Sequence, residues 1–320
     1  MVDAGASDPR SSVGAAIAWF DRNARDLPWR HPSVTAWGVL VSEVMLQQTQ
    51  VSRVAPVWTA WLDRWPRPSA LAAEPAGEVL RAWGKLGYPR RALRLHECAG
   101  VIAREHGDVV PSEVDTLLTL PGIGSYTARA VAAFAYRRRS PVIDTNVRRV
   151  IARMVHGRPF APTVSVARDL ADVDALLPAE PATAARFSIA LMEIGAVLCT
   201  ARAAPRCADC PLRIHCRWFR AGRPEAGARA ARPAPGFAGT DRQVRGMLLD
   251  VLRGQPEPAS RAQLDRAWTD HAQRDRCLDS LLVDGLVEQT ADGRFALPGE
   301  GQTALPGEGQ SALPGEGRSG

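Results

Sequence analysis

The stretch Leu120–Val150, LPGIGSYTARAVAAFAYRRRSPVIDTNVRRV, constrains the fold more than any other part of the chain. Apolar residues at helical spacing lie on both sides of the turn Leu120–Gly124. Gly122 and Gly124 allow the backbone to turn sharply, and Ser125 is a residue type that can cap the following helix. The stretch therefore predicts a helix–hairpin–helix whose free amides suit a phosphate, although such a turn is also often only a tight connection.

A single carboxylate follows the second helix of this unit. Arg137–Arg139 precede an apolar run that ends at Asp144, and Asn146 comes two residues later. An acid on the same short unit as a phosphate-binding turn suggests chemistry on nucleic acid. Aspartate is also a favoured helix cap, so Asp144 could simply begin a helix that extends to Ile151.

The overall composition permits an anionic partner without requiring one. The chain has 320 residues, a formal net charge of +6 and a sequence pI of about 9.4. No stretch is long and apolar enough to span a membrane, and the N-terminal segment lacks the apolar core of a signal peptide. We therefore expect a cytoplasmic protein, associated with the nucleoid if it is bacterial.

Four of the six cysteines form a cluster. Cys199, Cys207, Cys210 and Cys216 follow the pattern C-x7-C-x2-C-x5-C. Four thiolates could hold structural zinc or an iron–sulfur cluster. Zinc sites usually pair two short C-x-x-C units, and this chain has only one close pair, so the spacing favours iron–sulfur.

Glu43 lies in a helical pattern between Thr35 and Trp65, beside an apolar stripe that includes Leu40 and Val44. A carboxyl group in apolar surroundings has a raised pKa and can act as a general acid near neutral pH. From periodicity alone, however, a glutamate on the helix surface is the simpler interpretation.

The loop Lys85–Arg91 contains a glycine hinge, Tyr88 and two arginines. Such a loop could push a side chain into a base stack, or it could be an ordinary turn with a packed tyrosine.

The chain is expected to be all-α and to divide into five parts. These are a disordered N-terminus (1–12), a helical core (13–219) with a cysteine loop (199–216), a linker (220–239), a small module (240–297) and a disordered tail (298–320). Three helical segments and a hairpin signal at Asp292-Gly293 make the module winged-helix-like. The tail repeats ALPGEGQT, ALPGEGQS and ALPGEGRS, which are too poor in large apolar residues to pack.

The helix–hairpin–helix, the later aspartate and the cysteine loop together resemble the endonuclease III superfamily of DNA repair enzymes. Six segments resemble its adenine DNA glycosylase (MutY) branch: DLPWR (26–30), SEVMLQQTQV (42–51), KLGY (85–88), LPGIGSYTA (120–128), IDTNVRRV (143–150) and CPL (210–212). The resemblance covers about residues 13 to 218. SEVMLQQTQV is its most specific part.

The resemblance implies a monomeric, monofunctional glycosylase that flips adenine out of double-stranded DNA, opposite 8-oxoguanine or guanine, and cuts its N-glycosidic bond. Glu43 matches the acid that protonates adenine, and Asp144 the carboxylate that stabilises or traps the sugar cation. Tyr126 and Asn146 match residues that hydrogen-bond within the site.

The resemblance also implies DNA contacts and a cofactor. Arg30 would lie beside the adenine pocket. Gln48 and Tyr88 would insert into the duplex near the orphaned base. The further DNA-binding positions are Thr49, Leu86, Gly122, Gly124 and Ser125. Cys199, Cys207, Cys210 and Cys216 would hold a 4Fe–4S cluster.

The sequence departs from the family in three places. The first cysteine gap is one residue longer than usual. Ile189 stands where relatives commonly have a polar residue near the adenine. Residues 240–297 are too short for the Nudix-like domain that reads 8-oxoguanine in many relatives.

Three alternatives remain: a thymine glycosylase for T·G mismatches, an endonuclease III-like lyase, and a non-catalytic iron–sulfur DNA-binding regulator. Tyr126 stands where lyases place a lysine, which argues against the lyase. The presence of both Glu43 and Asp144 argues against the regulator.

Overall fold

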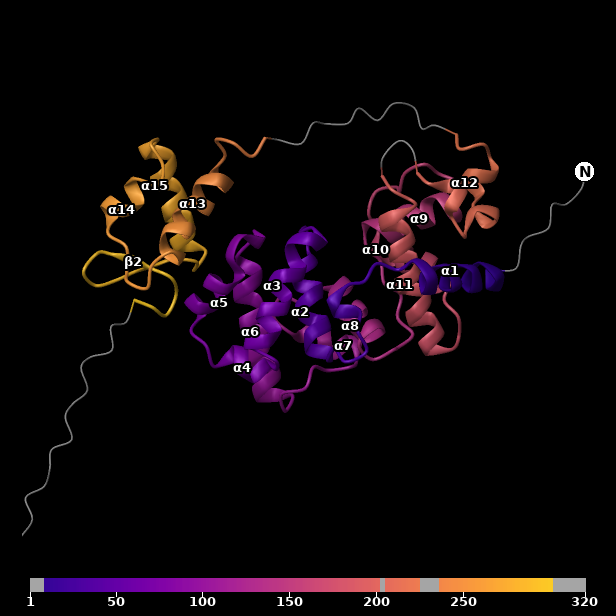
Figure 1. Ribbon diagram of the computed structural model, residues 1–320, viewed down its shortest axis with the longest axis horizontal. Helices are drawn as coiled ribbons and strands as arrows, with labels where there is room; N and C mark the ends of the chain where they lie inside the picture. The colour runs from indigo at the N-terminus through magenta and orange to yellow at the C-terminus, as the bar shows by residue number, and fades with distance from the viewer. Residues whose placement is uncertain (1–8, 202–204, 225–235, 302–320) are drawn as a thin grey trace, which may run out of the picture. The chain divides into compact units, whose positions relative to one another are not determined.

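The computed structural model describes residues 9–201, 205–224 and 236–301, and the chain separates into two compact units. Unit 1 comprises Met1–Glu74 and Lys85–Pro235, and unit 2 comprises Pro75–Gly84 and Gly236–Gly320. Almost all regular structure is helical, which confirms the predicted fold class (Figure 1). Residues 1–8, 225–235 and 302–320, parts of the predicted N-terminus, linker and tail, lie outside the described residues.

Unit 1 is built from helices alone in its described part. They are α1 (Pro9–Asn23), α2 (Ala36–Leu46), α3 (Val51–Arg64), α4 (Pro68–Ala72), α6 (Arg90–Glu105), α7 (Val114–Thr119), α8 (Ser125–Phe134), α9 (Thr145–Met154), α10 (Val166–Asp174), α11 (Pro181–Val197) and α12 (Arg217–Arg220). Short 3₁₀ turns occur at Pro28–Arg30, Gly84–Leu86, Cys207–Asp209 and Arg213–His215.

Helix α1 begins earlier than the sequence predicted. Residues 1–12 were expected to be disordered, but α1 starts at Pro9. Proline suits the first turn of a helix because its missing N–H needs no partner there. Ser12 is buried, and Val13 packs against the apolar cluster that α1 shares with α9 and α11. The packing of this first turn explains the longer helix.

The predicted helix–hairpin–helix consists of α7 and α8, which pack against each other (Figure 1). Gly122 has a φ of 75°, a backbone conformation that residues with side chains rarely adopt. A Cβ at this position would also lie 2.7 Å from Cβ of Arg94, so the backbone and the neighbouring residue both exclude a side chain. Ser125 does not cap α8 as predicted. The cap position is Gly124, and the Ser125 hydroxyl instead accepts a hydrogen bond from Nε of Arg129 at 3.4 Å.

Helices α9 and α11 approach each other closely at a glycine. Val147, Val150, Phe187 and Ile194 belong to one buried cluster between them. At Gly195, an added Cβ would lie 2.8 Å from Cβ of Asn146 and 2.9 Å from its carbonyl oxygen. The missing side chain therefore fixes the position of the first turn of α9, which follows Asp144.

Unit 2 combines helix α5 (Ala76–Trp83) with the C-terminal elements. These are α13 (Asp241–Arg253), α14 (Arg261–Asp265), α15 (His271–Val283), β1 (Glu288–Gln289) and β2 (Phe295–Ala296). The strands are antiparallel, with Glu288 opposite Ala296, and Ala259 forms an isolated bridge to Phe295. The sequence placed residues 76–83 in the helical core; they group instead with the C-terminal elements.

The first residues of the predicted disordered tail, 298–301, are ordered. Leu297 is fully buried, and the Gly299 amide donates to Glu288 Oε2 at 3.0 Å. Glu300 forms an ion pair with Arg81 of α5 at 2.9 Å. These contacts order residues that the composition alone marked as unable to pack. In the part of the chain that the structure describes, no helix is long and apolar enough to cross a membrane.

Replacing Gly195 by alanine should destabilise the protein by about 1–3 kcal/mol, because the new methyl group overlaps the backbone of Asn146. The matched control is Gly14→Ala in α1, where nothing lies within 4 Å of the added Cβ. That variant should be more stable than wild type by about 0.5–1 kcal/mol, as expected for glycine in a helix. Urea unfolding of both variants measures the difference, and equal effects would contradict the close approach.

Candidate active site

Helices α2 and α8 and the N-terminus of α9 bring two carboxyl groups and a tyrosine together. Glu43 lies on the buried face of α2 and is only 5% exposed, so it is not the surface glutamate that periodicity allowed. Tyr126, in the first turn of α8, donates a hydrogen bond from its hydroxyl to the Glu43 carboxyl. Asp144 is near enough to act electrostatically on both of them. Three residues from separate parts of the sequence thus share one site.

The environment of Glu43 favours its protonated form. Burial raises the pKa of Glu43 to about 7, and the negative charge of Asp144 acts in the same direction. The Tyr126 hydroxyl and the positive charge of Arg30 oppose this shift. Near neutral pH the carboxyl group can therefore hold a proton and release it to a substrate.

Asp144 is both a helix cap and a member of the site. Its Oδ1 accepts from the Val147 amide at 2.7 Å, which caps α9, and its Oδ2 accepts from Nδ2 of Asn146 at 2.7 Å. Burial raises the pKa of Asp144, whereas these hydrogen bonds and the charge of Arg149 lower it. The two interpretations from sequence are therefore compatible, because the capping bonds orient the carboxylate and favour its ionised form.

Arg149 links this carboxylate to the cysteine loop. Its Nη2 donates to Oδ1 of Asn146 at 2.8 Å and to the carbonyl of Gly195 at 2.7 Å. Its Nε donates to the carbonyl oxygen of Cys199 at 2.5 Å. Arg149 thus fixes the side chain of Asn146, which in turn holds Asp144.

Glu193 was not recognised from sequence as a site residue. Its side chain is fully buried on α11 and accepts from Nε of Arg25 at 2.7 Å and from Nη2 of Arg30 at 2.8 Å. Burial alone would raise the pKa of Glu193, but the hydrogen bonds from the two arginines outweigh it and hold the pKa at about 2. The available signal was a lone acid in the apolar run IALMEIGAV. Arg30, predicted beside the pocket, is positioned by this carboxylate.

The two residues expected to insert into DNA have unusual backbone conformations. Gln48 and Tyr88 are exposed and have φ values of 56° and 50°. Non-glycine residues rarely adopt this left-handed region, and such strain concentrates at functional sites. The conformation supports the predicted insertion, which remains a prediction.

Thr49 and Leu86, also predicted to bind DNA, are buried in the described structure. Thr49 Oγ1 donates to the Leu86 carbonyl at 3.3 Å and accepts from Nη2 of Arg91 at 2.9 Å. The burial of both side chains and the hydrogen bonds of Thr49 therefore hold the loop Lys85–Arg91 in place, and their contact with DNA stays a prediction.

Arg91 ties that loop to the helix that carries Glu43. Its guanidinium donates to the carbonyls of Val44 at 2.8 Å and Met45 at 2.9 Å, and to the carbonyl of Gly87 at 2.9 Å. Burial lowers the pKa of Arg91 to about 10, so the group stays charged at neutral pH. The sequence showed Arg91 only as a loop arginine, since its partners on α2 lie more than forty residues away.

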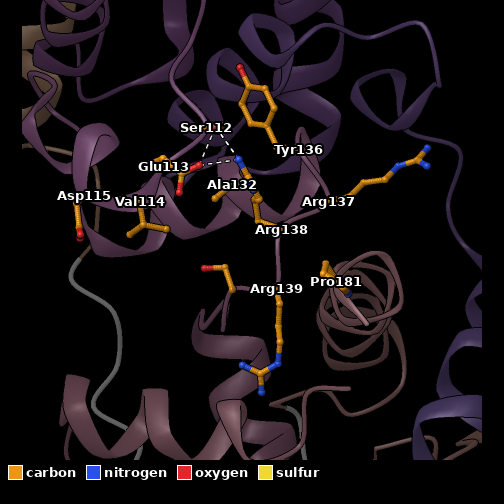
Figure 2. A pocket seen from close by; sticks show the side chains of 11 residues that line it. Ser112, Glu113, Val114, Asp115, Ala132, Tyr136, Arg137, Arg138, Arg139 and Pro181 are labelled. Atoms are coloured by element: carbon orange, nitrogen blue, oxygen red, sulfur yellow. Dashed lines mark hydrogen bonds and ion pairs between the residues drawn. The ribbon is translucent and has the colours of Figure 1, made fainter. Parts of the chain in front are cut away.

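The hairpin turn itself is open to solvent, since Gly122 and Gly124 are exposed. The arginines that follow α8 are less available than their sequence suggested. Arg138 pairs with Glu113 at 2.6 Å beside a hollow of about 560 Å³ (Figure 2). Arg139, which also lines this hollow, pairs with Asp174 at 2.7 Å. None of the candidate site residues lines this hollow, so it is separate from the carboxylate pair.

The four clustered cysteines lie near one another. Cys199, Cys207 and Cys216 each act electrostatically on Cys210, whose pKa burial raises to about 12. Nη1 of Arg153 also donates to Sγ of Cys199 at 3.3 Å. Within the described residues, which omit 202–204 of this loop, no three His, Cys, Asp or Glu side chains form a set that could hold a metal ion.

Comparisons with known proteins agree with this geometry. The profile of the HhH-GPD superfamily of base excision DNA repair proteins matches residues 41–172. The fold is similar to a thermostable thymine-DNA glycosylase (TM-score 0.60, 24% identity, 67% of this chain and 97% of that chain). It is also similar to endonuclease III in a non-covalent DNA complex (TM-score 0.57, 21% identity, 69% and 99%). The fold and the site therefore define the class: a helix–hairpin–helix base excision repair protein.

Sequence relatives narrow this class further. The chain is 66% identical over 284 residues to the adenine DNA glycosylase of Mycolicibacterium smegmatis, across 88% of this chain and 94% of the relative. It is 63% identical to that of Mycobacterium tuberculosis H37Rv, across 88% and 92%, and 39% identical to the human enzyme, across 64% and 38%. The chain belongs to the adenine DNA glycosylase family, as its motifs predicted.

The raised pKa of Glu43 makes stability depend on pH. The folded state holds the proton up to about pH 7, whereas the ordinary pKa is 4.5, so the free energy of unfolding should fall as pH rises between these values. Over this pH range the free energy of unfolding should decrease by a total on the order of 3 kcal/mol. Glu43→Gln should remove this fall and be more stable than wild type at pH 8.

The control for this measurement is Glu97→Gln on α6, whose side chain is 50% exposed. Chemical unfolding at pH 5 and pH 8 gives the comparison. If Glu43→Gln and Glu97→Gln show the same pH dependence as wild type, burial does not perturb Glu43.

Proposed function

We propose that this protein is a monofunctional adenine DNA glycosylase that removes adenine mispaired with 8-oxoguanine or guanine in base excision repair. The observation that carries the proposal is the buried Glu43, with a pKa of about 7, hydrogen-bonded to Tyr126 beside Asp144. Family membership supports the adenine substrate. The protein is then a hydrolase acting on double-stranded DNA, and we expect it to work as a monomer in the cytoplasm.

The two carboxyl groups have complementary tasks in this reaction. The adenine must first leave the base stack, which costs roughly a few kcal/mol and less at a mismatch. Glu43 donates its proton to the adenine ring as the bond between the base and the sugar C1′ breaks, so adenine leaves neutral. The anionic Asp144 stabilises the developing positive charge on the sugar, or bonds to it. Water then adds its hydroxyl group at C1′, and its remaining proton restores the Glu43 carboxyl group.

Surrounding residues support these tasks. Asn146 holds Asp144 through its bond to Oδ2, and Tyr126 orients the Glu43 carboxyl. Arg30, fixed by Glu193, contributes positive charge beside the acid and so favours release of its proton. Each contact positions a group before the substrate arrives, which lowers the cost of reaching the transition state.

Several features of the surface support binding to mispaired DNA. The exposed hairpin glycines offer backbone amides at the N-terminus of α8, where a phosphate is favoured. Gln48 and Tyr88 are held at exposed turns in strained conformations, from which they can enter a duplex. We assign these two residues to the strand opening that exposes the adenine.

We assign a 4Fe–4S cluster to Cys199, Cys207, Cys210 and Cys216. The four thiols act electrostatically on one another, and four thiolates are the donor set that such a cluster uses. When bound, the cluster supplies a rigid cross-link for its loop. On the protein side, Arg153 contacts Sγ of Cys199 and Arg149 contacts its carbonyl oxygen, so the loop adjoins Asn146.

Asp144→Asn and Glu43→Gln should each reduce adenine release by at least about 10²-fold while DNA binding survives, because both groups serve the chemistry. Single-turnover cleavage of A·8-oxoG, A·G and T·G duplexes gives the rates, and a mobility shift gives the affinity. Glu97→Gln serves as the control. Release of thymine but not adenine by the wild type would replace the proposal by its T·G alternative.

Strand cleavage should be absent. A β-lyase needs an amine that forms a Schiff base with the sugar, and Lys85 is the only lysine in the chain. Tyr126 occupies the position where related lyases carry that amine. The DNA product should therefore stay intact until alkali or heat breaks it, and borohydride should trap little protein–DNA adduct. Strong trapping by the Lys85→Ala variant would show that another amine, such as the N-terminus, reaches the sugar.

A further inference from the structure

Helix α5 joins the C-terminal module to the loop that carries Tyr88. It belongs to unit 2, yet it ends at Trp83, directly before the loop Gly84–Tyr88 of the glycosylase sequence. We propose that the C-terminal module (residues 236–301) positions this loop through Arg81 of α5 and thereby supports its entry into mispaired DNA. The inference rests on the proposed role of Tyr88 in insertion.

The side chain of Arg81 forms several hydrogen bonds between α5 and the C-terminal module. Its Nη1 donates to the carbonyl oxygens of Leu252, Arg253 and Gln255, at the C-terminal end of α13. Its Nη2 donates to both carboxylate oxygens of Glu300, each at 2.9 Å. The last carbonyl groups of a helix lack partners within the helix, and a positive side chain is favoured beside them. The Arg81 guanidinium therefore stabilises the C-terminal end of α13.

Two further contacts hold the same helix. The Gly77 amide donates to the carbonyl of Pro298 at 2.8 Å, and a Cβ at Gly77 would lie 2.5 Å from Oε1 of Glu300. From the opposite direction, Nε of Arg253 donates to the carbonyl of Leu80 at 3.0 Å. Backbone and side-chain bonds therefore fix both ends of α5 against the module.

The loop that follows α5 is well defined. Gly84, Gly87 and Tyr88 have φ values of 53°, 83° and 50°, and Leu86 between them is buried. The Gly87 carbonyl accepts from Arg91, which also bonds the last turn of α2. Arg91 therefore holds the C-terminal side of this turn, and α5 leads directly into its N-terminal side.

The net charge of the C-terminal module favours a role through α5 over direct binding of DNA phosphates. Residues 236–301 contain eight arginines and eleven acidic side chains, a formal charge of −3. Six of these arginines form ion pairs with acids within the module. The pairs are Arg245–Asp284, Arg253–Asp250, Arg261–Asp265, Arg274–Asp265, Arg276–Asp241 and Arg294–Asp292. Phosphate binding needs unneutralised positive charge, which this composition does not provide.

The test uses the full chain with Arg81→Ala. The change is made at Arg81 because the sequence ALPGEG, which contains Glu300, recurs at 304–309 and 312–317. Arg245→Ala is the matched control: the Arg245 side chain is 23% exposed against 24% for Arg81, and it forms a comparable ion pair that does not involve α5. Tyr88→Ala reports the role of the loop itself.

Two readouts separate positioning from stability. A duplex with 2-aminopurine beside the 8-oxoguanine and a non-cleavable adenine analogue opposite it reports unstacking as a rise in fluorescence. The second readout is the ratio of affinities for mispaired and fully paired duplexes. Arg81→Ala should lower the fluorescence rise and reduce that ratio about five- to tenfold, within the range typical of coupling between sites. Arg245→Ala should leave both near wild type.

The outcomes distinguish the possible failures. If Tyr88→Ala keeps the full fluorescence rise, the loop does not insert, and the proposed DNA contact is wrong. If Tyr88→Ala loses the rise but Arg81→Ala keeps it, the module does not position the loop. If Arg245→Ala and Arg81→Ala lose it equally at matched melting temperatures, general destabilisation explains the effect and the inference fails.

Discussion

The burial of one carboxyl group beside another is the constraint on which the rest of the site depends. Glu43 lies on a helix face with almost no access to solvent, and Asp144 adds its negative field. Two adjacent acids in such surroundings do not both ionise easily, so one retains a proton near neutral pH. Burial raises the pKa of both groups, but Asp144 accepts hydrogen bonds from Val147 and Asn146 that oppose the shift and favour its ionised form. The fold thereby separates an acid from a carboxylate within one site.

Arginine side chains that bind buried groups hold the remaining parts of this arrangement in place. Glu193 binds Arg25 and Arg30, Arg149 binds Asn146 and the cysteine loop, and Arg91 binds the end of α2. Buried ion pairs add little net stability, because desolvation offsets their attraction. Breaking one, however, leaves an uncompensated charge in the interior. The Glu193 ion pairs and the hydrogen bonds of Arg149 and Arg91 therefore fix geometry, which a reaction that depends on the relative position of two carboxyl groups requires.

Local sequence features predicted the fold well and the site only in part. The glycine turn and helical periodicity gave α7 and α8, because backbone geometry at Gly122 is a local property. Periodicity could not place Glu43 in the interior. The resemblance of SEVMLQQTQV to the adenine DNA glycosylase family identified Glu43 only as the acid. Glu193 and Arg91 were missed because their partners lie far away in the chain. The pairing of α5 with the C-terminal elements was equally invisible, since it depends on Arg81 and Glu300, which are 219 residues apart.

The strained turns at Gln48 and Tyr88 are bonded to the helix that carries Glu43. Gln48 and Tyr88 can remain in left-handed conformations only if surrounding bonds over-determine them. Thr49 and Arg91 provide those bonds, because Thr49 reaches the Leu86 carbonyl and Arg91 reaches both Gly87 and the last turn of α2. Glu43 lies in that same helix, within one turn of the carbonyls that Arg91 holds. Gln48 and Tyr88, which we propose enter the duplex, therefore share one bonded support with the helix that carries the proposed acid.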